Sequence, residues 1–141
     1  MDRAPVRAAI VGIGAIGGLF AAALARAGWD VSAFARGATL DALRERGLRI
    51  VGESGDETSL ALRASDDAHA LGEQDCVVVA LKAQALPALA ARIAPLVGPR
   101  TTLVAVMNGL PWWFFDGFGG PLDGAVLDAI DPGGVTAAAL P

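Results

Sequence analysis

Residues 8–25 read AAIVGIGAIGGLFAAALA, an uncharged stretch that changes character midway. Its first part, Ala8–Ile13, is a short apolar run with β-branched residues, typical of a strand buried on both faces of a sheet. From Ala15 to Ala27 the sequence is rich in alanine and leucine, which predicts a helix that ends at Gly28. The stretch therefore predicts a strand, a glycine-rich turn and a helix in direct succession.

Eighteen uncharged residues that follow Arg3 and Arg7 also suggest a membrane span or a secretory signal. Two features argue against both interpretations. The run changes from strand-forming to helix-forming residues, and it contains four glycines spaced as a loop needs them, Gly12, Gly14, Gly17 and Gly18. We therefore expect no membrane segment here.

The turn spells Gly12-Ile13-Gly14-Ala15-Ile16-Gly17, a GxGxxG motif between a predicted strand and a predicted helix. In such a motif Gly12 makes the tight turn, Gly14 lets a pyrophosphate approach the backbone, and Gly17 lets the helix pack closely on the strand. Free N–H groups at the start of the helix, including those of Ala15 and Ile16, then meet the phosphates. The alternative is that the glycines serve close packing alone. No GxxxxGK[ST] motif is present, so this is not a nucleoside triphosphatase loop.

The rest of the chain alternates strands and helices. Buried strands are predicted at Trp29–Ala35, Cys76–Leu81 and Thr102–Met107, and helices at Leu40–Arg46, capped by Thr39 and stopped by Gly47, and at Leu86–Leu96. Two antiparallel strands are predicted at Leu48–Val51 and Ser59–Arg63, a further short strand within Leu122–Ile130 and a helix start at Val135–Leu140. This alternation predicts an α/β fold of the Rossmann type, with a doubly wound, mostly parallel sheet and helices on both faces.

Composition narrows the function classes. The 141 residues suit one domain, and a hydrophobic content of 54% excludes intrinsic disorder. A net charge of −4 gives no electrostatic footprint for nucleic acid or an anionic membrane. A single cysteine and a single histidine exclude a disulfide framework and a Cys/His metal cluster, so no metal site is expected. Low cysteine use fits a reducing compartment, and we expect a cytoplasmic protein.

The second predicted strand ends in Arg36, where an enzyme that uses NAD has an acidic residue for the ribose 2′-hydroxyl. A guanidinium instead suits a 2′-phosphate by its charge and its bidentate geometry. The cofactor predicted is therefore NADP(H), and NAD and FAD are disfavoured. The alternative is that Arg36 is an ordinary surface arginine.

Two polar residues follow the later strands directly. Lys82 comes after CVVVAL and Asn108 after TLVAVM, so both are expected in the crevice at the carboxyl ends of the strands. There an ammonium would bind a substrate carboxylate or polarise a carbonyl, and an amide would orient a ribose or a substrate hydroxyl. The alternatives are that Lys82 only caps a strand in water and that Asn108 only forms an Asn-Gly turn.

His69 is expected to be solvated or helix-capping, and Cys76 to be a small core residue.

Four consecutive aromatic residues, Trp112 to Phe115, follow Pro111. No single amphipathic face buries four neighbours in a row, so some of them must be exposed or covered by something else.

Together these segments resemble the ketopantoate reductases (2-dehydropantoate 2-reductases). The resemblance rests on GIGAIGG, AFARG, ALKAQALPAL, VMNGLPWWFF and the tail GPLDGAVLDAIDPGGV. It implies the reduction of a small 2-oxo acid, 2-dehydropantoate, to pantoate with NADPH, in pantothenate and coenzyme A synthesis. It also implies that Lys82 and Asn108 line the nicotinamide and substrate site, where they assist catalysis. The family's lysine motif often reads Lys-x-x-Gln, whereas Gln84 here is two residues after Lys82.

The resemblance further implies a second, helical domain that supplies the general acid, so residues 1–141 are expected to be a dinucleotide-binding domain that is incomplete at its C-terminal end. The aromatic run from Trp112 to Phe115 would then meet that helical domain or a second copy of the chain. Two alternatives stay open. One is a related NADP-dependent 2-oxo-acid reductase, and the other is a non-catalytic, stand-alone NADP-binding module.

Overall fold

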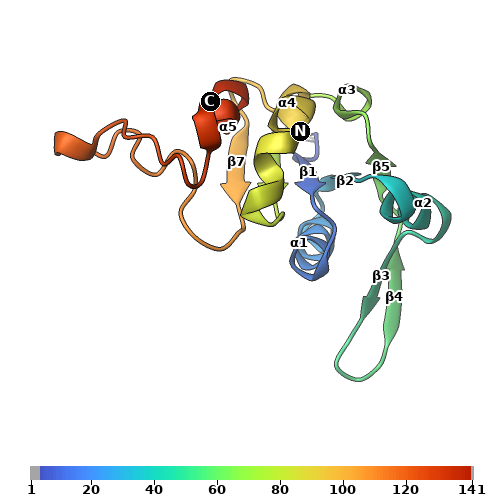
Figure 1. Ribbon diagram of the computed structural model, residues 1–141. Helices are drawn as coiled ribbons and strands as arrows, with labels where there is room; N and C mark the ends of the chain where they lie inside the picture. The colour runs from blue at the N-terminus through green and yellow to red at the C-terminus, as the bar shows by residue number, and fades with distance from the viewer. Residues whose placement is uncertain (1–3, 141) are drawn as a thin grey trace.

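The computed structural model describes residues 4–140 and is built around a five-stranded parallel sheet (Figure 1). The strands lie in the order β5-β2-β1-β6-β7. Their bounds are Arg63–Ser65 for β5, Asp30–Phe34 for β2, Arg7–Val11 for β1, Cys76–Val79 for β6 and Thr102–Ala105 for β7. All four pairings are parallel, which confirms the predicted doubly wound α/β fold.

The chain changes direction across the sheet between β1 and β6. From β1 it proceeds outward through β2 to β5, and then returns to pair β6 with the other side of β1. In open α/β sheets this topological switch point opens a crevice at the carboxyl ends of the strands, where ligands bind. The fold thus places the GxGxxG loop, which follows β1, at the switch point.

Helices cover both faces of the sheet because successive strand residues point to opposite sides. On one face α1 (Ala15–Arg26) and α2 (Gly37–Arg46) pack on Ile10, Ala33 and Val78. On the other face, Ala9, Val11 and Val79 lie under a layer formed by α3 (Ala68–Leu71), α4 (Leu86–Ile93), η2 (Ala94–Leu96) and α5 (Val135–Ala139). The short helix η1 (Ala83–Ala85) leads into α4. The uncharged stretch 8–25 is therefore split between a strand and a helix. No helix within residues 4–140 is long and apolar enough to cross a membrane.

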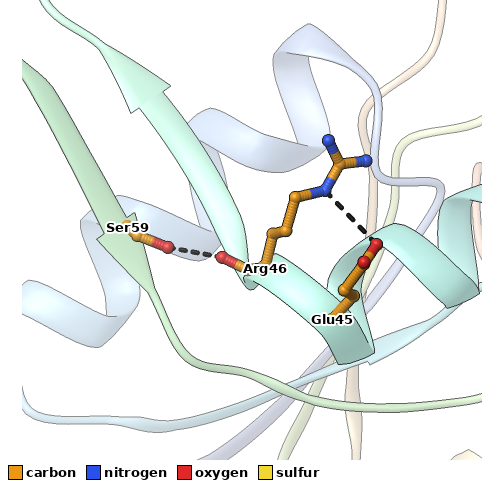
Figure 2. A network of polar contacts seen from close by, with 3 residues as sticks. All are labelled: Glu45, Arg46 and Ser59. Atoms are coloured by element: carbon orange, nitrogen blue, oxygen red, sulfur yellow. Dashed lines mark hydrogen bonds and ion pairs between the residues drawn. The ribbon is translucent and has the colours of Figure 1, made fainter.

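A separate antiparallel hairpin, β3 (Leu48–Val51) and β4 (Glu57–Leu60), projects from the sheet beside α2. Gly47 ends α2 with φ +71°, and a β-carbon at this position would lie 2.6 Å from the Leu60 carbonyl oxygen. The Ser59 hydroxyl donates a 2.6 Å hydrogen bond to the carbonyl of Arg46, as Figure 2 shows. The hairpin is thus fixed to the end of α2.

Three local predictions were wrong. The second helix begins at Gly37 with Arg36 at its N-cap, so Thr39 lies in the first turn and does not cap it. The second hairpin strand is Glu57–Leu60, and Arg63 belongs to β5 in the main sheet, because the chain leaves the hairpin earlier than its apolar residues indicate. Within Leu122–Ile130 there are turns and no strand, since this segment has no neighbour to pair with.

Residues 109–131, which we call the C-terminal arm, extend away from the sheet (Figure 1). The arm contains η3 (Gly120–Leu122), and η4 (Pro132–Gly134) leads from it into α5. Trp112 anchors the base of the arm, since its ring is buried and its indole N–H donates to the Leu140 carbonyl at 3.1 Å.

Candidate cofactor site

The carboxyl ends of β2, β1, β6 and β7 lie next to one another along one edge of the sheet. Hydrogen bonding continues one residue past the strands, from the Ala80 amide to the Val11 carbonyl and from the Val106 amide to the Val79 carbonyl, each at 2.8 Å. On the far side of β2, the Ala35 amide donates to the Ser65 carbonyl at 3.0 Å. The residues that follow these strands therefore lie at the same edge of the sheet.

Gly12 lies at the centre of this edge and is in contact with the strand beside it. Its φ is +94°, and a β-carbon there would lie 2.7 Å from the Ala80 carbonyl oxygen and 2.8 Å from the Leu81 side chain. Any other residue would therefore be strained and would collide with the chain that leaves β6. The contact of Gly12 with Ala80 and Leu81 could not be predicted from the sequence, because it joins two segments that are far apart in the chain.

Gly14 differs from Gly12 because it faces open space. A β-carbon at Gly14 would meet nothing within 4 Å, and the residue is exposed at the N-cap of α1. No side chain among the described residues caps this helix, and its first turn holds no acidic residue. The N–H groups of the first turn, which an α-helix cannot satisfy itself, and the positive end of the helix dipole are thus open to an anion. The geometry fits a pyrophosphate.

Arg36 lies on one side of this loop. It follows β2, the strand next to β1, and its side chain is exposed at the N-cap of α2. As in α1, no side chain in the described part of the chain caps α2, and its first turn has no acidic residue. A cationic side chain and an unneutralised helix N-terminus therefore occur at the same place.

Lys82 and Asn108 lie on the other side. Lys82 is the N-cap of η1 and follows β6, while Asn108 follows β7, the next strand outward, and both side chains are exposed. Gln84 lies within η1 and is exposed too. The fold thus brings the predicted residues to one edge in the order Arg36, glycine loop, Lys82, Asn108.

His69 and Cys76, the single histidine and the single cysteine of the chain, do not lie at this edge of the sheet. His69 is an exposed residue of α3, and its backbone amide donates to the Asp67 carboxylate at 2.9 Å, so Asp67 caps the helix. Cys76 begins β6 at the opposite end of the strand and is partly buried, and burial raises the pKa of its thiol. A thiol held protonated at the far end of a strand has no part in the crevice.

This chain is similar to a family of known enzymes. Residues 8–111 match the family model described as "Ketopantoate reductase PanE/ApbA". A 2-dehydropantoate 2-reductase of Mesorhizobium japonicum is 52% identical over 126 residues, which are 89% of this chain and 38% of that protein. A glycerol-3-phosphate dehydrogenase [NAD(P)+] of Streptomyces avermitilis is 39% identical over 108 residues, 75% of this chain and 32% of that protein.

Solved structures agree. A Ralstonia solanacearum protein that carries a provisional ketopantoate reductase name superimposes with a TM-score of 0.91 at 54% identity, over 98% of this chain and 42% of its own. For a 2-dehydropantoate 2-reductase of Geobacter metallireducens the TM-score is 0.68 at 32% identity, over 75% of this chain and 35% of its own. This chain thus spans well under half the length of the relatives it matches.

Proposed function

Because the chain belongs to the ketopantoate reductase PanE/ApbA family, we propose that residues 1–141 form the dinucleotide-binding part of an NADPH-dependent oxidoreductase that reduces 2-dehydropantoate to pantoate. The observation that carries the proposal is the open, uncapped N-terminus of α1 at the switch point of the sheet, between Arg36 and Lys82. Low cysteine use is consistent with a role in the reducing cytoplasm.

The comparisons favour a cofactor role for this segment over a substrate role. Relatives named for two different substrates, 2-dehydropantoate and glycerol 3-phosphate, match largely the same part of the chain. The name of the second relative includes NAD(P)+. A segment shared between enzymes with different substrates is best explained by a cofactor requirement common to both.

The preference for NADP(H) rests on Arg36. We assign its guanidinium to the 2′-phosphate, which it would bind bidentately, and the free N–H groups at the start of α2 would add a second source of positive potential. A ribose 2′-hydroxyl would require an acceptor, but the only acidic residue of β2 is Asp30, at the opposite end of the strand.

The substrate end of the crevice is assigned to Lys82 and Asn108. A bound nicotinamide supplies the hydride that reduces the ketone carbon. The Lys82 ammonium binds the carboxylate of a 2-oxo acid or polarises its carbonyl, and the Asn108 amide orients the ribose or the nascent hydroxyl. We assign the general acid to the part that relatives have beyond the matched segment.

Binding and turnover test this proposal separately. Fluorescence titration of the chain should show NADPH binding tighter than NADH binding, while addition of 2-dehydropantoate should give negligible turnover. Equal affinity for the two cofactors would refute the assignment of Arg36. Robust turnover by residues 1–141 would refute the placement of the general acid outside them.

Lys82→Ala and Asn108→Ala should weaken binding of the 2-oxo acid to the NADPH-loaded chain, with His69→Ala as the control.

A further inference from the structure

The side chain of Leu81 lies between the two halves of the proposed cofactor site. Leu81 directly precedes Lys82 in the chain, and its Cδ2 methyl group would be 2.8 Å from a β-carbon on Gly12. This methyl group therefore fills part of the space that a side chain at Gly12 would need. The segment that carries Lys82 is thus packed directly against the turn of the GxGxxG loop.

The other close contacts at this place are made by the backbone of Ala80. Its carbonyl oxygen and carbonyl carbon would be 2.7 and 3.0 Å from the same β-carbon. Ala80 is fixed by the sheet, because its amide donates to the Val11 carbonyl at 2.8 Å. The contact made by Leu81 differs, since a substitution can remove it and leave the sheet hydrogen bond in place.

Leu81 is itself held by the protein core. Its side chain is partly buried and packs against the core cluster on the α4 face of the sheet, which includes Val11, Val79 and Leu86. Protein interiors are close-packed, so a side chain in such a place has little freedom to move. Leu81 therefore gives the loop a rigid support.

The Gly12 turn has no side chain of its own to hold it. Its φ of +94° is a conformation that glycine adopts freely and that other residues rarely adopt. On one side its carbonyl oxygen packs against Gly17 of α1, and on the other side its α-carbon faces Leu81. The turn is thus held between a helix and the Leu81 side chain.

We propose that Leu81 is a positioning residue for the dinucleotide: it fixes the Gly12 turn, so that the N–H groups at the start of α1 meet the pyrophosphate, and it sets the place of Lys82 relative to this loop. Binding sites depend on such packed supporting residues for their geometry. The inference rests on the proposed function and adds a residue to it. Because NADPH and NADH share the pyrophosphate, Leu81 should affect both cofactors equally, whereas Arg36 should affect NADPH alone.

Substitution of Leu81 tests the inference by calorimetric titration with both cofactors. Leu81→Ala removes the contact with Gly12, and the affinities for NADPH and NADH should each fall about tenfold with their ratio unchanged. Leu81→Met conserves the side-chain volume and should keep most of the affinity. Leu81→Val should give an intermediate loss, and it serves as the second variant if Leu81→Ala does not fold.

Leu103→Ala is the matched control. Leu103 is also partly buried and packs against the same cluster, but it lies in β7 beside Val77, away from the carboxyl edge of the sheet. Both alanine variants should unfold more easily than the unaltered chain, yet only Leu81→Ala should bind the cofactors more weakly. In the cofactor-free chain, the amide NMR signals of Gly12 and Gly14 should move in Leu81→Ala and stay in place in Leu103→Ala.

The contrary outcomes separate this inference from the proposed function. Full cofactor affinity in Leu81→Ala and Leu81→Val, or equal weakening by Leu103→Ala, would overturn the role of Leu81 and leave the cofactor site in place. A changed ratio of NADPH to NADH affinity would overturn its placement at the shared pyrophosphate. If the unaltered chain binds neither cofactor, the proposed function is refuted and the role of Leu81 with it.

Discussion

The α-carbon of Gly17 packs directly against the carbonyl oxygen of Gly12, so that any β-carbon at Gly17 would overlap this oxygen. The contact brings the first turn of α1 onto the loop that leaves β1. It thereby holds the helix N-terminus at the switch point of the sheet, where the anion site is proposed.

Gly17→Ala should therefore destabilise the fold. The added methyl group collides with backbone, which cannot move aside as a side chain can, and we expect a loss of about 3 kcal/mol in the free energy of unfolding. Urea denaturation measures the loss. Gly18→Ala is the control, because a β-carbon there would be 3.5 Å from a Leu48 methyl group, an ordinary contact, and alanine raises helix propensity. A Gly17→Ala variant as stable as the Gly18→Ala variant would contradict the close packing.

Gly14→Ala should separate binding from stability. Its β-carbon enters open space and its φ of −97° suits any residue, so the free energy of unfolding should change by less than about 1 kcal/mol. The methyl group would stand where the pyrophosphate approaches, and NADPH affinity should fall about tenfold, equivalent to about 1.4 kcal/mol. Calorimetric titration with NADPH measures the change. Unchanged affinity would mean that the phosphates do not meet this turn.

Arg36→Ala should remove the discrimination between cofactors. Hydrogen bonds to charged groups contribute about 1.5–3 kcal/mol, so NADPH should bind about tenfold or more weakly while NADH binding stays the same. Arg26→Ala, an exposed arginine at the far end of α1, should alter neither affinity. An equal loss for both cofactors would show that Arg36 contacts a part common to them.

Trp112→Phe should loosen the base of the C-terminal arm. Phenylalanine keeps an aromatic ring but leaves the buried carbonyl of Leu140 without the indole N–H, at a cost of about 1–2 kcal/mol. Thermal unfolding should show the loss, and Trp113→Phe, at a partly exposed position, should cost less. If the two variants are equally stable, the hydrogen bond to Leu140 does not anchor the arm.

Asp131 should make stability depend on pH. Burial alone would raise the pKa of this carboxyl, but hydrogen bonds from Ala137 and Thr136 outweigh burial and lower the pKa in the folded chain. The stabilisation is therefore complete above the ordinary aspartate pKa and is lost as the pH falls through the lower, folded-state value. Asp131→Asn should be less stable at pH 7 and should lose less stability on acidification. Asp128→Asn is the control, and parallel pH profiles for the unaltered chain and Asp131→Asn would contradict the assignment.

Most of the parallel sheet could be predicted from the sequence, because its strands are continuous apolar runs and its first loop is a GxGxxG motif. β6 ends at Val79 and β7 at Ala105, two residues before the ends predicted at Leu81 and Met107, so Lys82 and Asn108 each lie three residues past their strand. Their roles in the crevice stay a prediction.

Other features depend on contacts that no local pattern records. The α2 helix begins at Gly37, and no side chain within residues 4–140 caps it, so a search for a capping residue selects Thr39 instead. Arg63 pairs with Ser32 of the main sheet, and only tertiary contact distinguishes this short strand from the hairpin before it. Beyond Gly109 the chain forms turns around an aromatic cluster, for which the sequence has no periodicity to interpret.

The central claim is that one edge of the sheet holds NADP(H), with the adenosine end at Arg36 and the nicotinamide end at Lys82 and Asn108. At 14.2 kDa the chain suits two-dimensional amide NMR, and titration with NADPH tests the claim directly. The amide signals of Gly12 to Gly17, Arg36, Lys82 and Asn108 should shift together and saturably, while those of η3 in the C-terminal arm stay in place. Saturable shifts confined to the C-terminal arm, or no shifts at all, would contradict this assignment.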